Sequence, residues 1–503
     1  MLHTYMDFTL TKQVEYIYQN QPTMFYLRHL VVIFGFLSLT GAAFTDLENF
    51  IRVLGSLDPN QSIVNYLNGS VFGKQPGSDL QKLFNYEGYN INRKIRQQDG
   101  SFLSLSREFV VYRQPNTSQI LQVWINPWSN KANEIFYVAN DPVNAILDSP
   151  SPSQRSEEYI IYNSDIVLEY PNPLSPDKYS NYSAGPIYDS VELFAFFANY
   201  TNLRDTLDKS VPFTGTWIRK SEYLPWMEMS TKPGCLYYTT MAWKCNEGLS
   251  CVSDDIMQLI KKYYPKYEYA PSQKEVPNET SWTVFKKVID QRRQAGLPDI
   301  IIPQVNTTSN IRTMTDSVDD RVLNILDAWP LSIKANGSAW SEIPGKQSVC
   351  FFNMFGYFQF DLEHLPEHNG YRIQLDGFVT YRDAETGKMI KNFTNPITGQ
   401  NNTLPKSEVG VDFVFKKDSF YTIDIPSSEV VGLLGAQSSE GTPDDDSDWS
   451  VNFIDLVFPY NELSKPPTSA HFFGTLASYS SWPSWMEMMD VPGNIVVKLT
   501  VSK

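Results

Sequence analysis

The chain has 503 residues, of which 42% are hydrophobic and 14% aromatic, and its formal net charge is -15. This apolar content is ample for packed cores and excludes global disorder, and the length predicts two large domains or three small ones. So acidic a chain repels phosphate backbones, and no Lys/Arg-rich run offsets this, so we expect no nucleic-acid partner.

The N-terminal segment has the pattern of a secretory signal peptide. Arg28 precedes the apolar run Leu30–Leu39, and small residues follow up to a predicted cleavage point near Ala43. We interpret residues 1–43 as this signal plus an over-extended start, with Met24 as the true initiator. The alternative is an uncleaved anchor, which the short apolar run disfavours. We therefore expect a secreted, extracellular protein with no stable membrane span after cleavage.

The mature chain begins with a predicted helix over Thr45–Gly55 and continues as the first domain, residues 44–295. Short runs rich in Tyr, Phe, Val, Ile and Thr, separated by Gly, Pro, Asn and Asp, predict strands, for example Glu158–Tyr162 and Ile166–Tyr170. Two further helices are predicted at the end of this domain, Asp254–Tyr264 and Ser281–Gln294, the second with apolar residues at helical spacing.

Linkers are predicted at Ala270–Pro277 and Gly296–Ser309, and the second domain covers residues 310–503. Gly435–Ser450 is rich in Gly, Ser and Asp and is expected to be a loop. Predicted strands of this domain are Val411–Phe415, Tyr421–Ile425 and Asn494–Val501. The fold class expected is mostly β: two tandem antiparallel β-barrel or sandwich-like domains with a few peripheral helices.

The two halves of the chain are diverged copies of one unit. Phe109–Ser129 and Phe378–Thr398 share seven identities without a gap, at an offset of 269. A second block, starting at Phe213 and again at Phe472, has nine identities in 22 positions at an offset of 259. A third block, from Asn68 onward, recurs at an offset of 268. Because the blocks keep their order, we infer an internal duplication that covers most of the mature chain.

Glycan acceptors and cysteines agree with a secretory route. The four cysteines allow two disulfides; we prefer Cys245–Cys251, which closes a short polar loop, and then Cys235–Cys350, with two free thiols as the alternative to the second bond. Ten asparagines stand in Asn-x-Ser/Thr: Asn60, Asn68, Asn116, Asn181, Asn199, Asn278, Asn306, Asn336, Asn392 and Asn401.

Three stretches of the first half carry a family resemblance. They run from Tyr112 to Trp128, over Val138–Asn144, and from Trp217 to Tyr237, and Asn-Asp-Pro-Val is the most specific part. With them, about Phe50–Lys287 resembles the bacterial and fungal domain-of-unknown-function family eighteen thirty-eight. The second half lacks the Asn-Asp-Pro-Val stretch and resembles a degenerate duplicate. The family has no established activity, so no catalytic residue follows from the resemblance.

The side-chain inventory excludes several mechanisms. After signal cleavage only His364, His368 and His471 remain, all in the second half, so the first half has no Ser-His-Asp or Cys-His mechanism. His364 and His368 have metal-ligand spacing, but Pro366 lies between them, and an exposed turn is the plainer interpretation. The alternating acidic residues at 444, 446 and 448 lack the remaining features of a calcium loop. We expect no metal site and no cofactor.

Residues found only in the first copy are the best candidates for function. Glu108, Asp141 and Arg219 would supply acid–base and oxyanion groups, and aromatic and amide side chains would line a cavity. The alternative is that Arg219 pairs with Glu108 or Asp141 to hold strands together. The ligand-binding candidates are Trp128, Trp217, Trp226, Tyr112, Asn126 and Asn140.

Glu228 is a further acid–base candidate, because it stands between Trp226 and two methionines and would be desolvated there. Glu487 repeats this motif in the degenerate copy, which favours a structural role. On a strand, Trp226 and Glu228 would share one face and the methionines the other.

Taken together, these patterns predict a secreted glycoprotein that binds a hydrophobic small molecule inside the first barrel. The rival hypothesis is a cofactor-free isomerase or cyclase acting on such a molecule. A third is a structural extracellular glycoprotein without a ligand. A titratable carboxylate in an apolar cavity would favour the enzyme hypothesis, and a purely aromatic lining would favour the binding hypothesis. A filled barrel would favour the structural role.

Overall fold

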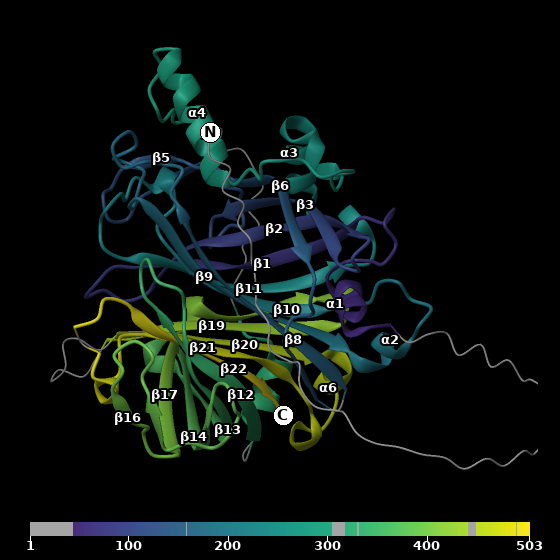
Figure 1. Cartoon of the computed structure of the whole chain (residues 1–503), viewed down its shortest axis with the longest axis vertical. Helices are drawn as coiled ribbons and strands as arrows, with labels where there is room; N and C mark the ends of the chain where they lie inside the picture. The colour runs from purple at the N-terminus through teal and green to yellow at the C-terminus, as the bar shows by residue number, and fades with distance from the viewer. Residues whose placement is uncertain (1–43, 157, 304–316, 329–330, 441–448, 489) are drawn as a thin grey trace, which may run out of the picture. The chain divides into compact units, whose positions relative to one another are not determined.

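The structure is a computed structural model that describes residues 44–156, 158–303, 317–328, 331–440, 449–488 and 490–503. The predicted signal region, Asn306 and the acidic residues at 444, 446 and 448 lie outside the described residues. Within the described part, two nine-stranded antiparallel sheets contain most of the strand residues, and the chain is mostly β as predicted (Figure 1).

The first sheet is an up-and-down meander that curls into an open barrel, here called the first barrel. Its spatial order is β6-β3-β2-β1-β11-β10-β9-β8-β7, so pairing of the first strand with the last bends the sheet round. In the described residues no ladder joins β6 to β7 or β8, which leaves a gap in the wall. The strands are β1 (Ile63–Lys74), β2 (Gln81–Arg96), β3 (Phe102–Arg113), β6 (Val138–Leu147), β7 (Ser153–Arg155), β8 (Tyr159–Pro171), β9 (Ile187–Asn199), β10 (Thr214–Ser221) and β11 (Cys235–Cys245).

The second sheet repeats this order and forms the second barrel. It reads β17-β14-β13-β12-β22-β21-β20-β19-β18, position for position the order of the first. The internal duplication inferred from sequence is therefore a duplication of the whole sheet. The strands are β12 (Leu331–Glu342), β13 (Cys350–Leu365), β14 (Gly370–Asp383), β17 (Glu408–Lys416), β18 (Phe420–Ile425), β19 (Val430–Glu440), β20 (Trp449–Pro459), β21 (Phe473–Ser480) and β22 (Asn494–Ser502).

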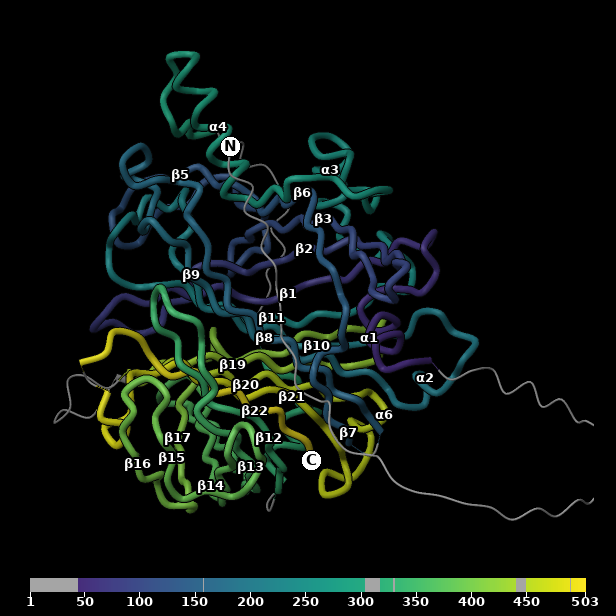
Figure 2. The backbone as a smooth tube through the Cα atoms, in the orientation of Figure 1, coloured from purple at the N-terminus to yellow at the C-terminus, as the bar shows by residue number. Residues whose placement is uncertain are grey.

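A short two-stranded ribbon accompanies each barrel, β4 (Val123–Ile125) with β5 (Ala132–Glu134) in the first and β15 (Asn392–Thr394) with β16 (Asn401–Thr403) in the second. Figure 2 traces the chain from the first sheet through α3 and α4 to the second. The α-helices of the described chain are α1 (Asp46–Leu54), α2 (Tyr200–Arg204), α3 (Asp254–Tyr263), α4 (Ser281–Gln294), α5 (Asp320–Leu326) and α6 (Tyr460–Leu463).

The predicted helices lie where their end signals put them. Thr45 and Glu48 form a capping box at the start of α1, which buries Phe50 and Val53 and ends at Gly55. The hairpin turn after β14 is held by the Asp383 carboxylate, which accepts from the Thr386 amide at 2.7 Å, and by Gly387 at φ 66°. Local turn and cap chemistry therefore explains these boundaries.

Two sequence interpretations need correction. The predicted loop Gly435–Ser450 is strand at both of its described ends: β19 runs to Glu440 and β20 starts at Trp449, because the two strands pair as far as these residues, whereas residues 441–448 lie outside the described part. Trp226 does not lie on a strand. It lies in a 3-10 turn, Pro225–Met227, and the following Glu228 takes a left-handed conformation at φ 54°. Period-2 alternation therefore does not apply to this motif.

The barrels contact each other through β9–β11 of the first and β19–β22 of the second, within the one compact unit Ala43–Lys503. The hydroxyls of Thr216 and Thr475, which are equivalent residues of the duplication, lie 2.8 Å apart and buried at this contact. Side chains from both barrels form one apolar cluster beside this pair: Phe72, Val191, Leu193, Ile218, Tyr237, Ala436, Val451, Phe453, Ala477, Tyr479 and Val496.

Candidate functional site

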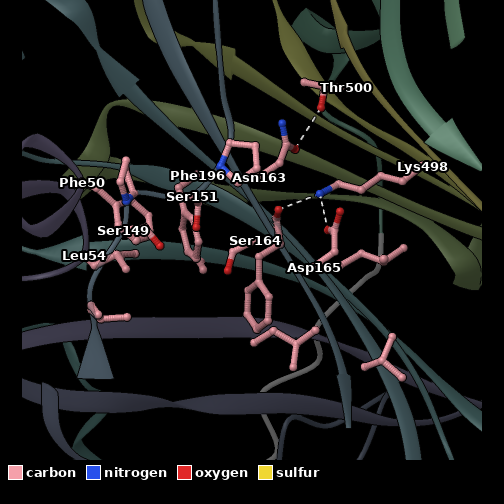
Figure 3. A pocket seen from close by; sticks show the side chains of 18 of the residues that line it. Phe50, Leu54, Ser149, Ser151, Asn163, Ser164, Asp165, Phe196, Lys498 and Thr500 are labelled. Carbon is pink, nitrogen blue, oxygen red and sulfur yellow. Dashed lines mark hydrogen bonds and ion pairs between the residues drawn. The ribbon is translucent and has the colours of Figure 1, made fainter. Parts of the chain in front are cut away.

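An open cavity of about 1110 Å³ lies in the first barrel and extends to the second (Figure 3). Its walls are residues of β1, β2, β3, β6, β8 and β9, and Phe50 and Leu54 of α1 border it. At the gap beside β8 the cavity continues to the second barrel, where residues of β12, β13 and β22 line it, among them Lys498 and Thr500. The missing ladder between β6 and β8 is therefore the opening of the barrel interior.

The interiors of the two barrels differ in chemistry. In the first, the paired strands β2 and β3 place Asn92 opposite Ser106 and Lys94 opposite Ser104, all lining the cavity. The duplication puts apolar residues at these positions in the second barrel, where they form its core. They are Phe358, Phe360 and Leu362 on β13 and Ile373 and Leu375 on β14, opposite one another in the same register. The polar, unfilled barrel interior is thus a property of the first copy.

Beside the cavity lies a buried charged cluster centred on Arg219 of β10. Its guanidinium lies 3.4 Å from the Glu192 carboxylate and donates to the hydroxyls of Ser190, at 3.0 Å, and Tyr188. The ring of Tyr238 faces the guanidinium at 5.4 Å. Burial raises the pKa of Glu192, while the Arg219 charge opposes that rise. Arg219 therefore pairs with Glu192, and not with Glu108 or Asp141 as the sequence interpretation had it.

Glu108 of β3 connects this cluster to the cavity, which it lines. Its carboxylate accepts from the Asn140 side-chain amide at 2.8 Å, and burial raises its pKa. The Asn140 carbonyl oxygen in turn accepts from the Ser281 amide and hydroxyl, at 2.6 and 2.8 Å, at the start of α4. The peripheral helix thereby fixes the amide that holds Glu108.

The structure brings together five of the predicted residues. Glu108 lines the cavity, and the Asn140 amide donates a hydrogen bond to the Glu108 carboxylate. Arg219 and Trp217 lie in the adjoining cluster. Tyr112 reaches this group through Tyr86, whose ring is 5.9 Å from Tyr112 and 5.7 Å from Trp217.

Sequence reasoning missed Glu192, Tyr188 and Lys94. Glu192 and Tyr188 lie on β9, outside every ungapped repeat block, so the comparison of the copies did not reach them. Lys94 lies beyond the end of the third block. Its signal was present in the sequence, as the change from Lys94 to Leu362 at the same offset of 268.

The remaining acid–base candidates lie away from the cavity. Asp141 forms an ion pair with Arg107 at 2.6 Å, beside the linker that contains Glu275. Glu228 is 3.6 Å from Lys131 at the end of its turn, and Glu487 has the same left-handed conformation at φ 51°. The shared backbone conformation supports the structural reading of this motif, because non-glycine residues adopt it only where the surroundings fix it.

Three predicted ligand-binding residues have structural contacts instead. Trp226 is buried among Phe84, Tyr112 and Trp124. Asn126 donates to the Met227 carbonyl at 3.1 Å and accepts from the Trp128 amide at 2.9 Å, so it joins the β4–β5 ribbon to the turn. Asn395, its equivalent in the second barrel, accepts in the same way from the amide two residues on. Trp128 stacks edge-on against Tyr223 at 5.4 Å.

The preferred disulfide, Cys245–Cys251, is confirmed, and it joins the end of β11 to the turn before α3. Cys235 and Cys350 are free thiols and do not bond to each other. Their surroundings differ: Cys235 belongs to the apolar contact between the barrels, whereas Cys350 lines the cavity. The alternative of two free thiols therefore fits the structure.

Most of the described glycan acceptors are accessible. Asn60, Asn116, Asn181, Asn278, Asn392 and Asn401 are exposed, whereas Asn68, Asn199 and Asn336 are half-buried. Among the residues that the structure describes, there is no group of three or more metal-ligating side chains and no helix of the length and hydropathy needed to cross a membrane.

Residues 60–289 match a family model described as a protein of unknown function (DUF1838), and the second half is not assigned to it. No curated protein matches the chain. A Nostoc punctiforme protein of unknown function from the DUF3598 family is similar at 8% identity and TM-score 0.22, with 92% of this chain and 99% of that chain covered. Pseudomonas aeruginosa OccK5 (OpdH) is similar at 8% identity and TM-score 0.14, covering 90% and 98%. At these TM-scores neither likeness carries an argument.

Proposed function

We propose that the first barrel binds a small, largely apolar molecule with a few polar groups. The observation that carries the proposal is the cavity of about 1110 Å³, whose part inside the first barrel lies where the second barrel is filled by apolar core residues. Leu67, Phe194 and Phe196 supply an apolar lining, and the size is at the upper end for small-molecule sites.

Polar atoms of the lining suit the polar groups of such a ligand. The side-chain oxygens of Asn65 and Asn92 are buried and accept no hydrogen bond from the described residues, yet both residues line the cavity. A buried acceptor without a donor costs about 1–3 kcal/mol, so turning either of these covered oxygens toward a ligand hydroxyl would recover this cost.

The test is ligand retention by the full chain, expressed in a secretory host and examined by native mass spectrometry. The wild type is expected to carry a stoichiometric small molecule or to be stabilised by members of a hydrophobic-ligand panel. Asn90→Phe places in the cavity the residue that the second barrel has there, Phe358, and should abolish binding. Ser332→Phe, on the exposed face of β12, is the matched control and should bind like the wild type. Equal binding by the wild type and Asn90→Phe would contradict the proposal.

We infer that the protein is a secreted glycoprotein, as its sequence predicts. The signal-like run before Ala43 supports this, as do the six exposed acceptor asparagines. Removal of N-glycans by an amidase should lower the mass of the secreted chain by several glycan units. An unchanged mass would contradict the inference.

A second candidate function is acid–base catalysis on the bound molecule, which the position of Glu108 favours. Burial raises the pKa of the Glu108 carboxyl group at the cavity wall, which favours its use as a proton donor, and the neighbouring Arg219 can stabilise negative charge. If the co-purified molecule is turned over, Glu108→Gln should lower kcat by at least about 100-fold while binding persists. An apo protein that no ligand stabilises would instead favour the structural role.

A further inference from the structure

Lys94 of β2 is a cation in the cavity wall without a counter-charge. The residue is 6% exposed, and among the described residues its amine donates only to the Ser104 hydroxyl, at 2.7 Å. An ammonium group has three N–H donors, so two of them have no protein acceptor. Burial without an anion lowers the pKa of Lys94 to about 8.

The other buried lysines in this region are satisfied in different ways. Lys498, which lines the same cavity, bonds to the Asp165 carboxylate at 2.6 Å and to the Phe194 carbonyl at 2.7 Å. Lys244 donates to the carbonyls of Arg52 and Gly55 and to the Ser210 hydroxyl. Of these three, Lys94 is therefore the one that can form strong additional bonds to an incoming group.

The position is also specific to the copy that has the cavity. The equivalent of Lys94 is Leu362, and the equivalent of its partner Ser104 is Ile373; both belong to the apolar core of the second barrel. The fold therefore needs no lysine here, and a buried unpaired charge is costly unless something compensates it.

We propose that Lys94 binds the acidic group of the ligand, so that the cavity accepts an amphipathic organic acid. The acid would receive charge-assisted hydrogen bonds from the amine, and its apolar part would lie against Leu67, Phe194 and Phe196. The inference rests on the proposed function and names its ligand class.

An imine between Lys94 and a ligand carbonyl is the less favoured chemistry. Its formation releases water and needs a proton donor close to the leaving hydroxyl. The nearest carboxyl group along the facing strand β3 is that of Glu108. It lies four residues beyond Ser104, the residue paired with Lys94, which places Glu108 about 13 Å along the strand from Ser104. Binding of an acid requires no such donor.

The experiment compares two probes of equal chain length, dodecanoate and dodecan-1-ol, by titration calorimetry on the full chain. The wild type should bind the acid at least about tenfold more tightly than the alcohol. Lys94→Leu, which installs the residue of the second barrel, should lose this preference to within about twofold and keep its alcohol affinity. Lys94→Arg should retain the preference. Lys94→Gln is the second neutral variant and gives the same test if the leucine variant does not fold.

An acid preference that persists in the neutral variants would overturn the role of Lys94, and so would equal affinity of the wild type for the two probes. In both cases the cavity would still bind ligands, and the proposed function would stand. Failure of the wild type to bind either probe, or any member of the hydrophobic panel, would overturn the proposed function and the inference with it.

Discussion

The two carboxylates beside the cavity are held differently, although both are buried. Glu192 lies against the Arg219 guanidinium, which offsets part of the cost of burying its charge. Glu108 has as its hydrogen-bond partner only the neutral amide of Asn140 among the described residues, and burial raises its pKa. A neutral donor offsets less of the desolvation than a cation does. Of these two carboxylates, Glu108 is thus the one that is buried without an adjacent cation to pair with.

Glu108 should therefore destabilise the protein as the pH rises. Because its folded pKa is raised above the unfolded value of about 4.3, its contribution is fully present below that value and is lost as the pH rises through the folded pKa. Glu108→Gln does not titrate, so its free energy of unfolding relative to the wild type should improve as the pH rises above about 4.3 and level off above the folded pKa of Glu108. Urea unfolding at several pH values measures this; a difference independent of pH would contradict it.

At the scale of elements, the sequence predicted what local chemistry decides. The start of α1, the residues of α4 and the turn at Asp383 follow from caps, spacing and turn residues, and the repeat predicted two equivalent sheets. The direction of a side chain depends on register, which the sequence does not contain. Glu108 and Asp141 were equally good candidates by residue type, yet one faces the cavity and the other pairs with Arg107 outside it.

The disulfide Cys245–Cys251 fixes the element that follows the first barrel. It closes a loop with a sequence separation of only 6, immediately before α3. Closing so short a loop removes less entropy from the unfolded chain than closing a long one. Replacing both cysteines by serine should therefore lower the free energy of unfolding by roughly 2 kcal/mol. Denaturant unfolding of the oxidised wild type and the double variant tests this, and an unchanged midpoint would contradict it.

At the scale of the whole molecule, the two barrels place different residues at equivalent positions of the contact between them. The Asp455 carboxylate, fully buried on β20, accepts from the Thr239 hydroxyl of β11 at 2.6 Å, and its second oxygen has no partner among the described residues. Burial raises the pKa of Asp455 well above its usual range, which the Thr239 hydrogen bond only partly opposes. The equivalent residue of the first barrel is Ala195. Ala195 is paired with Thr216 in the first sheet, and Asp455 is paired with the equivalent Thr475 in the second.

Replacing Thr239 alone and replacing Thr239 together with Asp455 should then change the stability of the protein in different directions. Thr239→Val leaves the carboxyl group buried without its donor and should destabilise the chain by about 2 kcal/mol. Adding Asp455→Ala installs the residue that the first barrel has at this place and removes the buried acid, so the double variant should be at least as stable as the wild type at pH 7. The reason is that an apolar pair avoids the desolvation cost that a lone buried acid incurs. Thermal unfolding of both variants decides the matter: a double variant as unstable as Thr239→Val would show that the hydrogen bond itself holds the barrels together.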